Sequence, residues 1–143
     1  YYIEPDSTRE YVDDENYTPQ QWYLQGSWTN GPESITHARS TSNLEDYIAF
    51  QFVGRSANVV VTPSGTEPYD VYIEIDGRPL KADEAGIDVI FGEDGRSYFT
   101  VTEPRLYAFL ETPRFGEHIV KLASDSDDFA IFAFTFGANE SGI

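Results

Sequence analysis

Apolar and polar residues alternate with a period of two along most of this 143-residue chain, as expected for half-buried β-strands. The clearest example is the segment 46–53, where Ile48, Phe50 and Phe52 would share one face of a strand. No segment has the 3.6-residue period of an amphipathic helix. The pattern, interrupted by turn residues, predicts short strands at 22–29, 33–39, 46–53, 58–63, 71–76, 87–91, 97–101, 105–110, 118–123 and 129–136.

Turn residues divide these strands. Asp76-Gly77 is a hairpin signal that leads into 78–80, and Gly, Ser or Pro predict breaks at 54–56 and 113–116. Helical turns are expected only at 44–45 and 82–85. Many short strands at a spacing of roughly 8–12 residues predict an all-β fold, a two-sheet antiparallel β-sandwich of the jelly-roll kind.

The division of the chain follows from the same pattern. Residues 1–19 are polar, acidic and without periodicity, so we expect an irregular N-terminal arm. Residues 20–143 contain no internal repeat or linker and are expected to form a single β-sandwich domain. The chain contains no Met, including at position 1, and we expect it to be a piece of a longer protein or a processed form.

Composition narrows the possible functions. The 25 acidic residues against 9 basic ones give a formal net charge of −16, which argues against binding nucleic acid or anionic lipid. Three explanations remain: solubility through charge repulsion, a salty environment that screens the repulsion, and cation binding. The absence of Cys excludes a disulfide or a redox pair. No apolar stretch approaches the length of about 18 residues needed to span a membrane.

The chain carries few residues arranged for catalysis. His37 and His118 do not lie in a nucleophile motif such as G-x-S-x-G. We expect His118 to be a satisfied, partly buried polar group and His37 to lie on the surface or at a sheet edge. Glu74 and Asp76 share one face of a strand, as a hydrolase pair would, but Asp76 is more simply a turn residue. The sequence therefore predicts no enzyme.

A cluster of carboxylates offers a possible metal site. Asp125, Asp127 and Asp128 lie within four residues, between the last two predicted strands. Carboxylate oxygens are the ligands that Ca²⁺ prefers, so these residues predict a structural calcium site. The alternative is a plain hairpin loop, because the spacing is not that of an EF-hand.

Tyrosines on the outward register of the strands suggest a second kind of site. Apolar sugar faces stack on exposed rings, and neighbouring polar side chains bond their hydroxyls. The alternative is that these rings cap sheet edges or pack beneath the arm. The predicted ligand-binding residues are Tyr47, Tyr72, Glu74, Tyr98, Arg105 and Tyr107, with Gln51 as a further polar neighbour.

An ordered set of motifs carries a resemblance to a known family. The segments are WYLQGSWTNGPES (22–34), IAFQFVGRSANVVV (48–61), VYIEIDGRPL (71–80), RLYAFLE (105–111), GEHIVKL (116–122) and IFAFTFG (131–137). Together they resemble the C-terminal, carbohydrate-binding-module-like domain of DipZ-type thioredoxin-like proteins. The resemblance implies a sandwich domain, periplasmic or at the cell surface, behind a thioredoxin-like domain. It also implies that Trp22 and Trp28 belong to the core.

Two functions follow as hypotheses. The first is a non-catalytic accessory module of an extracytoplasmic thioredoxin-like protein, binding carbohydrate through an aromatic-bearing sheet face. The alternative is a docking or scaffold module that packs on its own thioredoxin domain or on a client protein. A groove with rings and convergent polar groups would favour the first, whereas a flat apolar patch rimmed by charge would favour the second.

Overall fold

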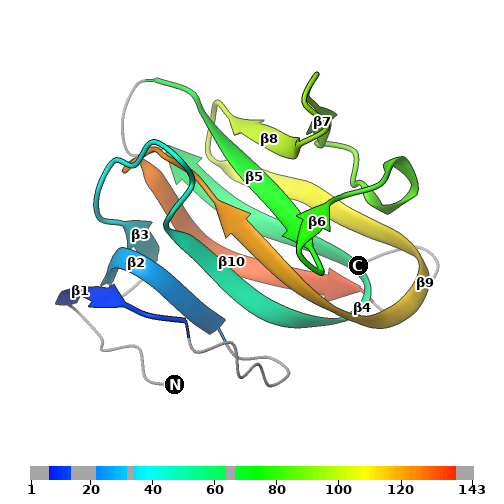
Figure 1. Ribbon diagram of the computed structural model, residues 1–143, viewed down its shortest axis with the longest axis horizontal. Helices are drawn as coiled ribbons and strands as arrows, with labels where there is room; N and C mark the ends of the chain where they lie inside the picture. Colours follow the sequence, from blue (N-terminus) through cyan, green and yellow to red (C-terminus); the bar gives the residue numbers. More distant parts are fainter. Residues whose placement is uncertain (1–6, 14–21, 32–33, 64–66, 138–143) are drawn as a thin grey trace.

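The computed structural model describes residues 7–13, 22–31, 34–63 and 67–137 (Figure 1). Within these ranges all regular secondary structure is strand except for one 3₁₀ turn, and no helix is long and apolar enough to cross a membrane. The elements are β1 (Ser7–Tyr11), β2 (Trp22–Asn30), β3 (Ile35–His37), β4 (Tyr47–Pro63), β5 (Tyr69–Ile75), β6 (Arg78–Pro79), η1 (Ala82–Glu84), β7 (Ile90–Phe91), β8 (Ser97–Val101), β9 (Arg105–Ala123) and β10 (Phe129–Gly137).

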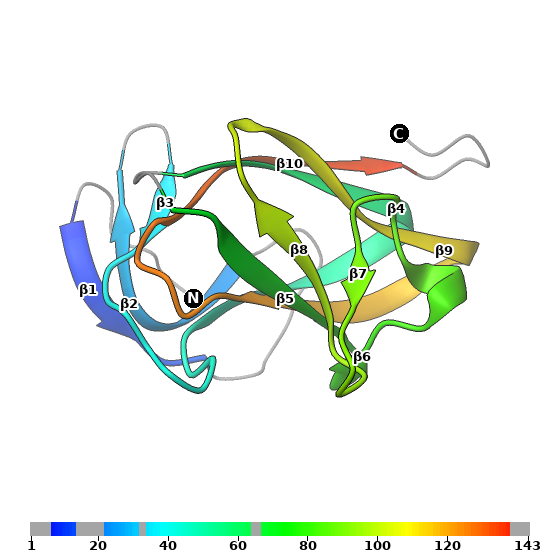
Figure 2. The same cartoon turned by 90° about the horizontal axis from the view of Figure 1, so that it is seen from above.

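The strands form two layers that share β4 and β9. Strand order is β1-β2-β3-β10-β4-β9-β5-β8-β7, and neighbouring strands pair antiparallel. The first half of β4 and the second half of β9 lie in one layer with β2, β5 and β8, whereas their other halves pair with each other beside β10. Figure 2 shows β5 and β10 on different sides of the molecule. The predicted all-β, jelly-roll-like sandwich is confirmed.

The breaks predicted at 54–56 and 113–116 are wrong, because β4 and β9 continue through both. Gly54 pairs with Gly116, but Ser56 pairs with Glu111, so the ladder omits residues 112–115 of β9. Pro113 lies in this omitted stretch, where its missing N–H interrupts no ladder bond. The two strands therefore bend together instead of ending.

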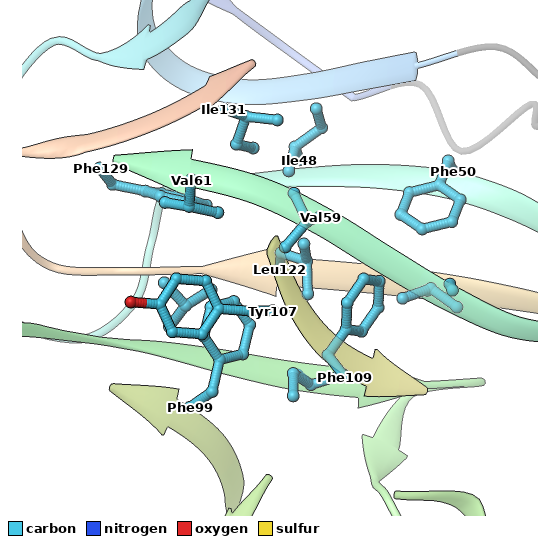
Figure 3. Close-up of a cluster of buried hydrophobic side chains, with 14 of the residues drawn as sticks. Ile48, Phe50, Val59, Val61, Phe99, Tyr107, Phe109, Leu122, Phe129 and Ile131 are labelled. Atoms are coloured by element: carbon cyan, nitrogen blue, oxygen red, sulfur yellow. The ribbon is translucent and has the colours of Figure 1, made fainter. Parts of the chain in front are cut away.

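Both layers contribute apolar side chains to one core (Figure 3). The alternation predicted for 46–53 and 71–76 is confirmed, since Ile48, Phe50, Phe52 and their counterparts on β5 are buried. Phe99 of β8 stacks on Tyr107 of β9, with ring centroids 5.2 Å apart, and so joins the two layers. Trp28 is also buried, as expected, whereas the side chain of Trp22 lies outside the described residues.

Several local predictions differ from the structure. Part of the arm expected to be irregular is β1, which pairs with β2; the described portion of the arm ends at residue 13. The strand expected at 33–39 is limited to β3, and that expected at 87–91 to β7. The helical turn near 82–85 is confirmed as η1. No turn forms at 44–45, where Leu44 instead adopts a φ of 55°.

Replacing the ring that joins the layers tests this packing. We expect Phe99→Ala to lower the free energy of unfolding by about 3–5 kcal/mol, because it leaves a cavity between Tyr107 and Phe109. Urea denaturation measures the loss. Phe115→Ala is the control, since this ring is 58% exposed and its loss should change stability by less than about 0.5 kcal/mol. Equal effects of the two substitutions would contradict the two-layer core.

Candidate functional site

A pocket of about 420 Å³ opens on the outward face of the layer that contains β5, and several of the predicted ligand-binding residues line it. Strands β4, β5 and β9 supply its centre, and the loops before β4 and before β8 supply its rim. The lining residues are Asn43, Leu44, Tyr47, Tyr72, Ile73, Glu74, Pro79, Arg96, Ser97, Lys121 and Ala123.

Strand register places the two pocket tyrosines on either side of a small residue. Tyr47 of β4 is opposite Ala123 of β9, and Ala123 is opposite Tyr72 of β5. Because neighbouring strands lie about 4.8 Å apart, the two tyrosine backbones are separated by roughly 10 Å. The methyl group of Ala123 fills little of this interval, so the row is hollowed at its middle. Tyr72 is in turn opposite Tyr98 of β8, and their rings lie 5.2 Å apart.

The next row brings charge to the same hollow. Lys121 of β9 is opposite Glu74 of β5. The Lys121 ammonium nitrogen lies 4.5 Å from the centre of the Tyr47 ring, and the Arg96 guanidinium carbon lies 5.4 Å from the centre of the Tyr72 ring. Both distances are those of cation–π contacts. Burial raises the pKa of Tyr72, with a smaller contribution from the carboxylate of Asp70.

Tyr47 is held in place from the N-terminal side. Its hydroxyl donates a hydrogen bond of 2.8 Å to Oδ2 of Asp13, a buried residue just after β1. The backbone N–H of Asp13 donates to the side-chain oxygen of Gln25 on β2. The pairing of β1 with β2 therefore fixes one wall of the pocket.

An ion pair supports the opposite wall. Arg78 donates hydrogen bonds of 2.8 and 2.9 Å to the two carboxylate oxygens of Glu84, which also accepts from the backbone N–H of Lys81. The Arg78 hydrogen bonds outweigh burial and lower the Glu84 pKa from 4.5 to about 2. Next to them, Ser97 accepts from the Leu80 N–H and donates to the Ile73 carbonyl. Together these bonds fasten β6, which carries Pro79, to β5 and β8.

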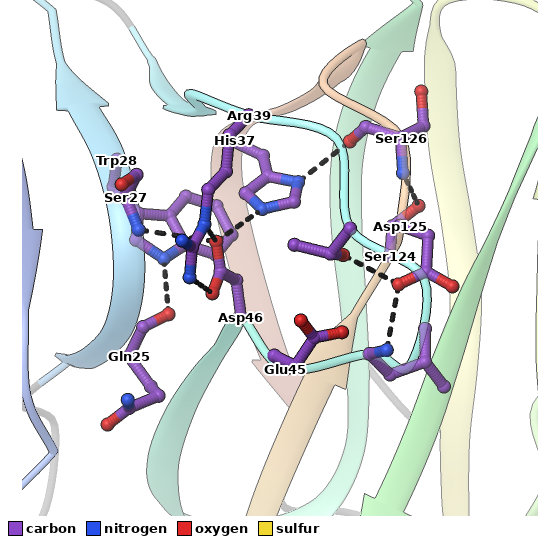
Figure 4. A network of polar contacts seen from close by, with 12 residues as sticks. Gln25, Ser27, Trp28, His37, Arg39, Glu45, Asp46, Ser124, Asp125 and Ser126 are labelled. Atoms are coloured by element: carbon purple, nitrogen blue, oxygen red, sulfur yellow. Dashed lines mark hydrogen bonds and ion pairs between the residues drawn. The ribbon is translucent and has the colours of Figure 1, made fainter.

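The loop that carries Asn43 and Leu44 depends on Asp125 (Figure 4). Oδ1 of Asp125 accepts hydrogen bonds from the Leu44 N–H (2.7 Å) and from the Thr41 hydroxyl (2.6 Å). Asp125 thus caps a loop, and nowhere in the described ranges do three His, Cys, Asp or Glu side chains gather as a metal ion would require. Asp125 therefore has a structural role in this loop, and the calcium site expected from Asp125, Asp127 and Asp128 stays a prediction.

A buried carboxylate anchors the start of β4 (Figure 4). Asp46 is fully buried and accepts hydrogen bonds from Arg39 (2.6 and 2.7 Å), from Nε2 of His37 (2.8 Å) and from the Ser27 N–H. Burial opposes its charge, but the bonds from Arg39 and His37 prevail and lower the Asp46 pKa. Gly26 is required beside it, because a Cβ there would lie 2.0 Å from the carboxyl group.

The prediction that His37 lies on the surface or at a sheet edge is wrong, since β3 lies between β2 and β10. His37 is 1% exposed, and its other ring nitrogen donates to the Ser126 carbonyl at 2.8 Å. His37 thus links the β10 side of the molecule to Asp46. His118 is partly buried, as predicted, and donates to Asp76, whose other oxygen accepts from the Ile119 N–H. Asp76 is the expected turn residue, while Glu74, its proposed hydrolase partner, faces the pocket.

The structure brings together some of the predicted ligand-binding residues and separates others. Tyr47, Tyr72 and Glu74 line the pocket, and Tyr98 packs behind Tyr72. Gln51 lies farther along β4, where it donates to Glu117. Arg105 and Tyr107 are at the other end of β9, in the other layer.

The assignment of Tyr107 as an exposed ring is wrong. Tyr107 is 1% exposed, and its hydroxyl donates to the Glu103 carbonyl. A bulge lies between Leu106 and Leu110: Ala57 pairs with Leu110, whereas Asn58 pairs with Ala108. Leu110 is therefore buried with Tyr107, while Leu106 is exposed. Arg105 lies over the Tyr107 ring and is paired with Asp88.

Asn43, Arg96 and Lys121 are pocket residues that sequence reasoning did not identify. Lys121 had a signal in the sequence, since it alternates with the buried Val120 and Leu122 and so must point outward. Arg96 and Asn43 come from loops, where periodicity carries no information.

The fold is that of a β-sandwich domain found within larger proteins. A solved family two carbohydrate esterase from Clostridium thermocellum, in complex with cellohexaose, matches 78% of this chain at 20% identity with a TM-score of 0.53. An active-site mutant of a family two carbohydrate esterase from the same organism matches 84% at 18% identity with a TM-score of 0.60. The matches cover 28% and 32% of those chains, so this chain spans about a third of their length.

The family itself is defined by sequence. The chain belongs to the family described as thioredoxin like C-terminal domain, whose model matches residues 2–137. Comparison with curated proteins gives no match. The structural similarity, at 20% identity or less, establishes the fold and leaves the ligand to be argued from the pocket.

The Arg78–Glu84 ion pair that supports one wall of the pocket predicts that the stability of the fold depends on pH. Because the Glu84 pKa in the folded protein is about 2, below its ordinary value of 4.5, the pair stabilises the fold fully above about pH 4.5, and this contribution is lost as pH falls toward 2. We expect Glu84→Gln to cost about 1–3 kcal/mol at pH 7 and progressively less between pH 4.5 and 2. Urea denaturation across this pH range measures the difference, with Glu93→Gln, at an exposed position, as control. A constant difference between wild type and Glu84→Gln would contradict the role of the charge.

Proposed function

We propose that this chain is a non-catalytic accessory module that binds carbohydrate in the pocket between Tyr47 and Tyr72. The observation that carries the proposal is the row Tyr47–Ala123–Tyr72, which combines two partly exposed rings with a hollow and with hydrogen-bonding side chains. Sugar rings present apolar C–H faces and polar edges, and they need both kinds of contact in one place.

Each part of the pocket has a role in this scheme. The tyrosine rings supply apolar surface for a sugar ring held over Ala123. Glu74 accepts hydrogen bonds from sugar hydroxyls, and the amide of Asn43 both donates and accepts. The rings are held by Asp13 and by Tyr98, so little conformational entropy is lost when a ligand orders them.

Membership of the family supports the proposal that the chain is an accessory domain of a larger protein. A thioredoxin like C-terminal domain follows a thioredoxin-like domain, and this chain has no Cys with which to perform redox chemistry itself. We infer that it serves as the accessory domain of an extracytoplasmic thioredoxin-like protein of the DipZ type, periplasmic or at the cell surface. Its pocket would hold that protein close to glycan.

Removing one ring tests carbohydrate binding. We expect Tyr72→Ala to weaken binding of the glycans found by array screening about tenfold or more, because the hollow loses one wall. Isothermal titration measures the affinity. Phe115→Ala is the matched control, since it removes an exposed ring at the bend of β9, outside the pocket. Absence of any glycan signal from the wild-type chain, or equal loss in both variants, would contradict the proposal.

A second candidate function rests on β10. Phe132 and Phe136 are 42% and 41% exposed, and the rings of Phe134 and Phe136 are stacked nearly parallel, 6.3 Å apart. Exposed rings on one strand suit contact with another protein domain. This surface favours docking on the thioredoxin-like domain, which would leave the pocket free.

Side-chain oxidation footprinting tests the docking surface. We expect Phe132 and Phe136 to be protected from hydroxyl radicals when the chain is linked to its thioredoxin-like domain, compared with the chain alone, because the domain would cover them. Phe115 is the internal control in the same experiment. Unchanged oxidation of Phe132 and Phe136 would contradict docking on β10.

A further inference from the structure

The charge of the pocket is opposite to that of the chain. The full sequence has 25 acidic and 9 basic residues. The pocket lining has one acidic residue, Glu74, and two basic ones, Arg96 and Lys121. A surface of this composition would by chance present carboxylates in such a hollow, so the reversal of sign is a local property of the site.

The two cations of the pocket are also held differently from Arg39 and Arg78. Arg39 and Arg78 each donate two hydrogen bonds to a buried or nearly buried carboxylate, Asp46 and Glu84, which neutralises them. Lys121 lies instead over the Tyr47 ring, and within the described ranges it has no carboxylate at ion-pair distance. An aromatic face fixes the position of a cation without cancelling its charge.

Arg96 is only weakly neutralised. It lies over the Tyr72 ring and pairs with Asp94 at 3.2 Å, but both side chains of this pair are more than half exposed. Exposed ion pairs are worth little, because water screens both charges, and they exchange partners easily. Two cations on the rims of one hollow, fixed by rings and open to solvent, are suited to receive an anion.

We propose that the pocket selects acidic carbohydrate, that is, sugars that carry a carboxylate, an inference that rests on the carbohydrate binding proposed above. The carboxylate accepts charge-assisted hydrogen bonds from Lys121 and Arg96. The sugar ring lies over Ala123 between Tyr47 and Tyr72. Glu74 accepts from hydroxyl groups and repels a carboxylate, so it orients the acid group toward the cations.

Matched pairs of neutral and acidic sugars test the selection. The probes are cellohexaose against β-1,4-linked hexaglucuronate, and methyl-esterified against free oligogalacturonate, titrated into the whole chain by calorimetry. In each pair the sugar chain is retained and the carboxylate is removed or masked. We expect the acidic member to bind about tenfold or more tightly than the neutral one. Equal or tighter binding of the neutral members overturns the acidic selection and leaves carbohydrate binding intact. Binding of no member overturns both proposals.

Substitutions in the pocket locate the effect. We expect Lys121→Gln and Arg96→Gln each to weaken acidic binding about tenfold more than neutral binding, because only the acidic ligand uses the charge. Arg96→Lys should restore most of the loss, since it restores the charge. Arg114→Gln removes one positive charge from an exposed site outside the pocket and is the matched control. Thermal unfolding verifies that each variant is folded.

Two outcomes would overturn the assignment to this pocket. One is acidic selection that survives the double substitution of Lys121 and Arg96 in a folded protein. The other is an equal loss in Arg114→Gln, which would indicate an effect of net charge alone. Salt dependence is a poorer test, because added salt screens both the attraction of the pocket and the repulsion from a chain of net charge −16.

Discussion

The joint bend of β4 and β9 is the constraint on which the rest of the structure depends. At this point the ladder passes from the pair Gly54–Gly116 to the pair Ser56–Glu111, and side-chain and backbone bonds between Arg55 and Thr112 hold the two strands together. Gly54 is needed because its φ is +150° and a Cβ would approach a backbone oxygen to 2.8 Å. Two long strands thereby serve both layers, and the core closes between the two halves of the same antiparallel strand pair.

The pocket forms where β4 and β9 pair regularly, without a bulge. In the layer that contains β5, residues 47–54 of β4 pair with residues 116–123 of β9, and β9 pairs with β5, without a bulge. Rows of outward side chains therefore stay aligned across these three strands. Aligned rows make the outward face predictable: a small residue between two rings produces a hollow, and the row beside it brings Lys121 opposite Glu74. In the other layer, a bulge breaks the alignment and turns Tyr107 into the core.

The contrast between regular strand pairing in one layer and a bulge in the other explains how much of the fold and of the site the sequence could predict. The period of two identified the fold and the pocket residues Tyr47, Tyr72 and Glu74, because each lies on a stretch of strand that pairs without a bulge. It failed for Tyr107, since a bulge leaves no signal in the pattern of apolar residues. It also failed for His37, whose burial depends on a partner, Asp46, that only the tertiary fold brings to it.

The alternation of apolar and polar residues also could not predict the roles of loop residues. Asp125 was interpreted as a metal ligand from its neighbours in sequence, but its partners are Thr41 and Leu44, more than 80 residues away. A carboxylate in an acidic loop has no local feature that distinguishes a cap from a ligand, because both need the same oxygen atoms. The distinction depends on which backbone N–H groups the fold brings within hydrogen-bond distance.

The net charge of the chain and the charges next to a ligand act over different distances. Selection of a charged ligand by the pocket would depend on the nearby charges. At physiological ionic strength the field of exposed charges is screened over about 8 Å, so the −16 of the whole chain is felt weakly by a ligand inside one hollow. Contacts with Lys121 and Arg96 are shorter than this and are partly shielded from water by the tyrosine rings. Under the proposal of an acidic ligand, the sign of the nearest charges decides which sugar is retained, and the net charge of the chain does not prevent binding. Repulsion from the rest of the surface then acts mainly on the rate of approach, which makes the cations at the rim the part of the site on which selection depends.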